Sequence, residues 1–206
     1  MQIVVLGNES YREELGEHSG VQWVSTFQEL ISTDADVYVD LLFENDPERV
    51  NALKQLDHKT VVINSNLYTV TELKAPFVRI NGWNSFLKNT VECYSENEQK
   101  EKIEEPFAVL GWKAEWLPDQ VGFITPRVVS MIINEAFFAL AEAVSTKEEI
   151  DTAMKLGTAY PYGPFEWAEK IGLKNVYQLL ARLSKDQPRY IPADLLHQTI
   201  NSSNHS

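Results

Sequence analysis

The hydrophobic period of the sequence changes near residue 119, and this change constrains the fold more than any other feature. Before it, short apolar runs rich in β-branched residues alternate with polar stretches, which is typical of strands separated by helices. After it, apolar residues recur at helical spacing. We therefore expect two domains: an α/β domain over residues 1–118 and an all-α domain over residues 119–206.

Six segments of the first domain have the composition of short strands. Residues 3–6 (IVVL) form a continuous apolar run, as expected for a strand buried on both faces. The other five strands are predicted over residues 21–24, 36–43, 60–64, 77–80 and 91–94. A helix is predicted over residues 47–56, with Asp46 as its N-cap and Pro47 in its first turn. Strands that alternate with helices pair in parallel, so a small, open parallel sheet is expected.

The second domain carries the signals of four helices. Residues 127–144 place a broad apolar stripe on one face, and this helix is expected to have Thr125 as its cap and Pro126 in its first turn. A second helix should end near residue 156, and its start offers two alternative capping boxes: Ser145 with Glu148, or Thr146 with Glu149. Two further helices are predicted over residues 165–171 and 174–183.

The charge balance excludes several classes of function. The chain has 18 Lys and Arg residues against 30 Asp and Glu residues, which gives a formal net charge of -12. Nucleic-acid binding needs a basic surface that replaces counterions along the phosphates, so we expect no nucleic-acid partner. No apolar run approaches the ~20 residues that span a bilayer, and the first residues are typical of a strand rather than a signal peptide. We therefore expect a cytoplasmic protein without a membrane partner.

The cysteine and histidine content predicts no metal site. Cys93 is the single cysteine, so the chain cannot form an internal disulfide. The four histidines are scattered along the chain: His18, His58, His197 and His205. They do not stand at the spacing of a zinc ligand set.

A series of spaced motifs marks residues 121–173. In order, they are Gly122-Phe123-Ile124, Arg127, Asn134-Glu135-Ala136, the run from Ile150 to Gly157, and the turn from Pro161 to Phe165. Together they resemble the C-terminal helical domain of the 3-hydroxyacyl-CoA dehydrogenases. The first domain is similar to the dinucleotide-binding domain of that family more loosely, through its strand order and residues 82–92. The resemblance implies a reduced Rossmann-like sheet domain followed by a helical domain.

The resemblance also implies a chemistry, which is hydride transfer between NAD and the 3-hydroxyl of an acyl-CoA. In the family, a histidine takes the hydroxyl proton, a glutamate orients that histidine, an asparagine begins the first C-terminal helix, and a serine contacts the substrate oxygen. The corresponding positions in this sequence are, in that order, Asn84, Glu92, Pro126 and Ser65.

Two of these four positions lack the side chain that the chemistry needs. Histidine accepts a proton near neutral pH, whereas the amide of Asn84 has no titratable nitrogen there. Pro126 has no polar side chain that can hydrogen-bond a developing oxyanion. Without a histidine partner, Glu92 can equally be a solvated carboxylate at a strand end, and Ser65 can equally be a turn residue.

The cofactor loop is degenerate as well. Dinucleotide binding uses Gly-x-Gly-x-x-Gly after the first strand, so that the backbone can approach the pyrophosphate. Only Gly7 of this pattern remains, and Glu9 adds a negative charge where the diphosphate would sit. We therefore expect no cofactor, although the family uses NAD.

Three hypotheses about function remain open. The first is a family member without redox activity, a pseudo-enzyme that acts as a binding or assembly module and that has an acyl-CoA as a candidate ligand. Because the stripe over residues 128–140 is too apolar to leave exposed, this module should be a homodimer through its helical domain. The second is a shortened, active NAD-dependent dehydrogenase of fatty acid metabolism in which His58 replaces the lost base. The third is a structural partner protein that binds neither ligand.

Overall fold

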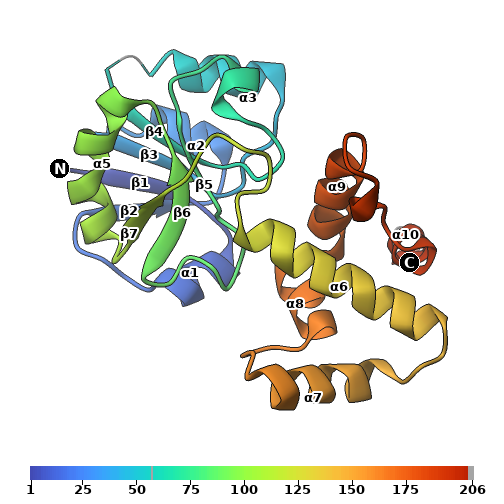
Figure 1. Ribbon diagram of the computed structural model, residues 1–206. Coiled ribbons are helices and arrows are strands. Elements are labelled where there is room, and N and C mark those ends of the chain that lie inside the picture. The colour runs from blue at the N-terminus through green and yellow to red at the C-terminus, as the bar shows by residue number, and fades with distance from the viewer. Residues whose placement is uncertain (57, 204–206) are drawn as a thin grey trace. The chain divides into compact units, whose positions relative to one another are not determined.

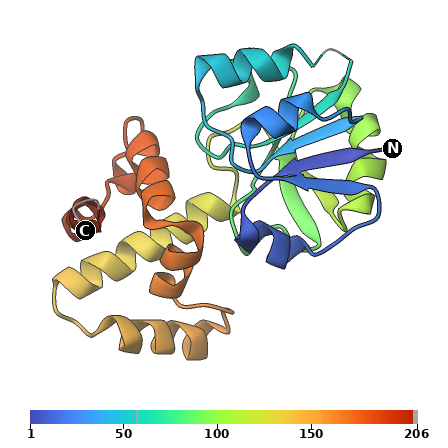
Figure 2. The same cartoon turned by 180° about the vertical axis from the view of Figure 1, so that it is seen from behind.

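The computed structural model describes residues 1–56 and 58–203, so His205 lies outside the described residues. The chain divides into two compact units, residues Met1–Phe123 and Ile124–Ser206, and each is described by itself. The division falls shortly after the boundary expected at residue 118. Figures 1 and 2 show that the first unit is built on a sheet and that the second is built from helices.

The first unit contains a seven-stranded sheet in the order β2-β1-β3-β4-β5-β6-β7. Its strands are β1 (Ile3–Leu6), β2 (Val21–Val24), β3 (Val37–Asp40), β4 (Thr60–Asn64), β5 (Val78–Ile80), β6 (Thr90–Tyr94) and β7 (Lys113–Trp116). The strands β1 to β5 are mutually parallel. The expected α/β class is therefore confirmed, and β7 is a strand that the sequence analysis did not predict.

The expectation of a wholly parallel sheet is wrong at β6, which pairs with β5 in the antiparallel sense. A parallel pair needs a crossover of a dozen or more residues, usually through a helix. Residues 81–89 join β5 to β6 and contain no helix, so the chain turns back on itself. The next connection contains α5 (Asn97–Val109), and β7 is accordingly parallel to β6.

Helices cover both faces of this sheet, as Figures 1 and 2 show. Besides α5 they are α1 (Glu9–Leu15), α2 (Phe27–Ser32), α3 (Pro47–Lys54) and α4 (Val70–Leu73). Alternate residues of β1 point to opposite faces, so Val5 packs in one core with α1 and α5, and Val4 packs in the other with α2 and α3. Asp46 caps α3 as predicted, because its carboxylate accepts hydrogen bonds from the backbone of Glu48 and Arg49.

The second unit consists of α6 (Thr125–Ala141), α7 (Lys147–Thr158), α8 (Pro164–Ile171), α9 (Leu173–Leu183), a short 3-10 helix (Pro188–Tyr190) and α10 (Asp194–Ser203). Thr125 is the first residue of α6 rather than its cap, a place that Ile124 takes. Of the two alternative capping boxes before α7, the structure uses Thr146 with Glu149. The helix α10 was not predicted.

Two buried polar side chains hold the helices of the second unit together. The Asp151 carboxylate on α7 accepts hydrogen bonds from the backbone N–H of Phe165 (2.8 Å) and of Glu166 (3.2 Å), and so caps α8. The Asn134 amide on α6 donates to the Ile191 carbonyl (3.0 Å) and accepts from the Ala193 N–H (2.8 Å). The segment that leads into α10 is therefore fixed to α6.

Candidate functional site

The carboxyl ends of the parallel strands of the first unit meet at one edge of the sheet. The chain order changes direction beside β1, because β2 lies on one side of β1 and β3 lies on the other. Open α/β sheets bind their ligands beyond the strand ends at such a switch point. Two of the predicted site residues lie here: Gly7 directly follows β1, and Ser65 directly follows β4.

Tyr11 occupies the space beyond these strand ends. Its side chain is the buried one of α1, and its hydroxyl donates to the Gly82 carbonyl (2.8 Å) and accepts from the Asn64 amide (3.4 Å). Asn64 in turn donates to the Leu41 carbonyl (3.0 Å) and accepts from the Gly82 N–H (2.9 Å). Burial and the nearby Glu14 carboxylate both raise the pKa of the Tyr11 phenol, so it stays a neutral donor. One hydrogen-bond network thus joins the ends of β3, β4 and β5.

Gly7 is packed against side chains of the same unit. A Cβ atom at this position would lie 2.8 Å from the Cζ3 atom of Trp23 and 3.2 Å from the Cβ atom of Tyr11. The first distance is shorter than real Cβ contacts and the second is tight, so a side chain here would require the Trp23 ring to shift. The N-terminus of α1 is capped by Asn8, whose side chain accepts from the Tyr11 N–H (3.2 Å). Aromatic packing therefore accounts for the one glycine that remains of the dinucleotide pattern.

Ser65 and Glu92 both have partners within the first unit. The Ser65 hydroxyl, which is buried, donates to the Tyr68 carbonyl (2.9 Å) and accepts from the Tyr68 N–H (3.3 Å). The half-buried Glu92 carboxylate on β6 accepts from the Asn81 amide (3.4 Å), and the Asn81 oxygen accepts from Asn66 (3.1 Å). The structure thus links Glu92 to two asparagines at the carboxyl ends of β4 and β5, both of which the sequence analysis missed.

The two substituted positions lie in different units. Asn84 is half-buried in the connection between β5 and β6, close in sequence to the Gly82 and Asn81 that the networks above use. Pro126 is buried in the first turn of α6, in the second unit. Neither residue carries a group that titrates near neutral pH.

Two buried ion pairs of the first unit were also missed from sequence. Asp40, at the end of β3, is fully buried and accepts two hydrogen bonds from Arg49, at 2.7 and 2.8 Å. Burial raises the pKa of Asp40, and the paired guanidinium acts in the opposite direction. The sequence shows an acidic residue at the end of a strand and a basic residue on the following helix, but no local pattern indicates that the two side chains pair.

The second buried pair is formed by Arg79 on β5, whose side chain is completely inaccessible, and Asp119 (3.3 Å). Arg79 also donates to the backbone carbonyls of Gln120 (2.8 Å) and Tyr68 (3.2 Å), and its guanidinium lies 4.0 Å from the centre of the Phe123 ring. Asp119 accepts from the first N–H groups of α4 as well. Arg79 therefore fixes the last segment of the first unit to the loop after β4.

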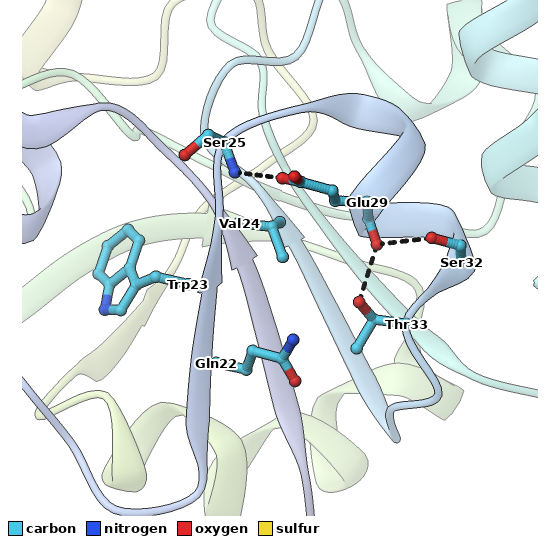
Figure 3. A pocket seen from close by; sticks show the side chains of 7 residues that line it. All are labelled: Gln22, Trp23, Val24, Ser25, Glu29, Ser32 and Thr33. Atoms are coloured by element: carbon cyan, nitrogen blue, oxygen red, sulfur yellow. Dashed lines mark hydrogen bonds between the residues drawn. The ribbon is translucent and has the colours of Figure 1, made fainter.

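A groove of about 350 Å³ runs between β2 and α2, and Figure 3 shows its lining. Two of the hydroxyls that line it, those of Ser32 and Thr33, donate to the Glu29 carbonyl. The Glu29 carboxylate accepts from the Ser25 N–H (2.9 Å). Because these polar groups hold the end of the strand and the two ends of α2, the groove offers little chemistry for a ligand.

The described part of the chain contains no group of three or more His, Cys, Asp or Glu side chains that could hold a metal ion. Among those same residues, no helix is long and apolar enough to cross a membrane.

Comparison with known proteins identifies the helical unit. Residues 122–205 match the C-terminal domain of 3-hydroxyacyl-CoA dehydrogenase. The 3-hydroxyadipyl-CoA dehydrogenase of Escherichia coli K12 is 43% identical over 84 residues, which are 40% of this chain and 18% of that protein. Residues 122–205 are therefore a domain of the type found at the C-terminus of the 3-hydroxyacyl-CoA dehydrogenases.

The similarity extends over the first unit more weakly. A probable 3-hydroxybutyryl-CoA dehydrogenase of Bacillus subtilis is 26% identical over 210 residues, which cover 93% of this chain and 73% of that protein. The crystal structure of (S)-3-hydroxybutyryl-CoA dehydrogenase from Ralstonia eutropha aligns with a TM-score of 0.72 at 24% identity, over 90% of this chain and 71% of that one. The chain therefore has the fold of this solved structure, and its match spans less than a fifth of the length of the Escherichia coli protein.

Proposed function

We propose that this chain is a 3-hydroxyacyl-CoA dehydrogenase family member that keeps the fold without the hydride-transfer chemistry, and that it acts as a homodimeric binding or assembly module. The observation that supports this most strongly is the Tyr11 network, in which the phenol lies 2.8 Å from the Gly82 carbonyl beyond the strand ends. A dinucleotide at the switch point would have to displace this buried side chain and break its hydrogen bonds.

The available proton acceptors support the same proposal. The position of the family's histidine holds Asn84, and Glu92 is hydrogen-bonded to Asn81 instead. His58 is the substitute base of the alternative hypothesis, but it is exposed and precedes β4. Ser65 follows β4, so the five residues of this strand, or roughly 16 Å at about 3.3 Å per residue, separate His58 from Ser65.

A turnover assay tests the proposed loss of redox activity. We expect no oxidation of NADH in the presence of acetoacetyl-CoA, followed at 340 nm with a 3-hydroxybutyryl-CoA dehydrogenase as positive control. Turnover by the wild-type chain that disappears in His58→Ala would reject the proposal in favour of the active dehydrogenase.

Thermal denaturation with NAD and with an acyl-CoA distinguishes a binding module from a structural partner protein that binds neither ligand. A ligand that binds only the folded state raises the melting temperature. A shift with acyl-CoA alone supports a binding module, and no shift with either supports a purely structural partner.

Exposed apolar side chains of the second unit support the proposed homodimer. The inner half of the α6 stripe, including Ile133 and Phe137, is buried within this unit. Large apolar residues remain exposed on and after α6 and on α7: Val128 (51%), Phe138 (38%), Val144 (69%) and Leu156 (83%). A second copy of the chain would cover such a surface by an isologous contact.

Light scattering at micromolar concentration tests the assembly. We expect a dimer for the wild type and a monomer for the double variant Val128→Asp with Leu156→Asp. The double variant Asn175→Asp with Gln178→Asp is the matched control, because it adds the same two negative charges at exposed positions of α9. A monomeric wild type, or a double variant that remains dimeric, would exclude this interface.

A further inference from the structure

The loop that follows β5 holds the carboxylate of a distant glutamate between two backbone N–H groups. The Glu14 Oε2 atom accepts from the Ser85 N–H (2.7 Å), and its Oε1 atom accepts from the Leu87 N–H (3.1 Å). Each carboxylate oxygen therefore has its own amide donor. Charge-assisted hydrogen bonds of this kind are about twice as strong as neutral ones.

The conformation of the loop creates this arrangement. Ser85 has a φ of 78°, a left-handed conformation that is uncommon for a residue with a side chain. Residues 83–86 form a turn in which the Phe86 N–H donates to the Trp83 carbonyl (3.1 Å), while the N–H groups of Ser85 and Leu87 donate to the Glu14 carboxylate. The loop is anchored at Trp83 and at Leu87, whose side chains are almost completely buried. The donors are consequently held in place by the core rather than by the carboxylate alone.

We propose that residues 84–87 form a backbone binding site for a carboxylate or phosphate oxyanion, which the chain's own Glu14 occupies. Glu14 is thus a tethered competitor for any external oxyanion. A tethered group has an effective concentration in the millimolar range or above, so a free anion at similar concentration competes poorly while Glu14 is present. This inference does not depend on whether the chain carries out redox chemistry, because it concerns contacts of the first unit alone.

Removal of the internal carboxylate tests the proposal on the full-length chain. The variants are Glu14→Ala and, as matched control, Glu13→Ala, which deletes the neighbouring exposed carboxylate of α1. Each is titrated with acetate and with inorganic phosphate against sodium chloride of equal ionic strength. The backbone amide resonances of Ser85 and Leu87 are followed by NMR.

We expect both resonances to move saturably with acetate or phosphate in Glu14→Ala, and to stay in place in the wild type and in Glu13→Ala. The melting temperature of Glu14→Ala should rise in parallel. Response to acetate alone assigns a carboxylate site, and response to both anions assigns a general oxyanion site. Movement no larger than that with chloride, or equal movement in all three proteins, would overturn the proposal. If Glu14→Ala does not fold, Glu14→Gln replaces it, because an amide keeps one acceptor oxygen and removes the charge.

Discussion

Replacement of Arg79 should destabilise the first unit more than any surface change of equal size. Its guanidinium is fully buried and contacts Asp119, three backbone carbonyls and the Phe123 ring. Removal of one partner of a buried, hydrogen-bonded ion pair costs about 3–5 kcal/mol, because the groups left behind lose their counter-charge and donors away from water. We therefore expect Arg79→Met, which keeps the length of the side chain without its charge, to lower the free energy of unfolding by about 3–5 kcal/mol.

Urea denaturation followed by tryptophan fluorescence measures this loss, since four of the five tryptophans lie in the first unit. Lys59→Ala is the control, because Lys59 is partly exposed and its ion pairs with Asp34 (3.7 Å) and Asp36 (4.0 Å) are long. Such surface pairs contribute about 0–1 kcal/mol. If Arg79→Met is as stable as Lys59→Ala, then the packing of the aliphatic stem, rather than the buried charge, holds this segment.

Three further predictions concern individual side chains. Hydrogen bonds from Ser145 and Thr146 lower the pKa of Glu149 from its ordinary value of 4.5. The stability that Glu149 contributes is therefore present above pH 4.5 and is lost as the pH falls through the lower pKa of the folded state. In Glu149→Gln, the melting temperature should consequently depend less steeply on pH below 4.5. Burial raises the pKa of Cys93 to about 12, so at pH 8 a chromogenic disulfide should modify the folded chain on the order of a thousandfold more slowly than the chain in urea, and equal rates would show an accessible thiol. Asn134→Ala should cost about 1–3 kcal/mol in thermal unfolding, because one buried carbonyl and one N–H lose their partner, whereas an unchanged melting temperature would show that water replaces the amide.

Local signals predicted most of the secondary structure correctly. The apolar run of β1, the Asp46 cap of α3 and the capping box of α7 each lie within a few consecutive residues, and all three are confirmed. The elements that were missed have weak local signals. The strand β7 mixes charged and aromatic residues, and α10 is polar along most of its length. Their places depend on contacts with distant parts of the chain.

The predicted site residues were assigned from the resemblance to a family, whereas the Tyr11 network at the strand ends is visible only in the folded structure. Tyr11 on α1 and Gly82 after β5 are 71 positions apart, and Asn64 is the last residue of β4. No periodicity or spacing in the sequence indicates that these residues meet. The resemblance indicates that Asn84 stands at the position of the family's histidine, but only the structure shows that Tyr11 occupies the space beyond the strand ends.

The tight packing around Gly7 limits what a single substitution at the strand ends could change. Changing Asn84 to histidine would introduce an imidazole, but the Tyr11 phenol would still be hydrogen-bonded at the strand ends and the Trp23 ring would still lie beside Gly7. Replacing Tyr11 by a small residue would leave the Asn64 amide and the Gly82 carbonyl without that partner. A change at residue 84 alone thus leaves the strand ends filled, and a change at Tyr11 alone removes one partner from each of two polar groups in the interior.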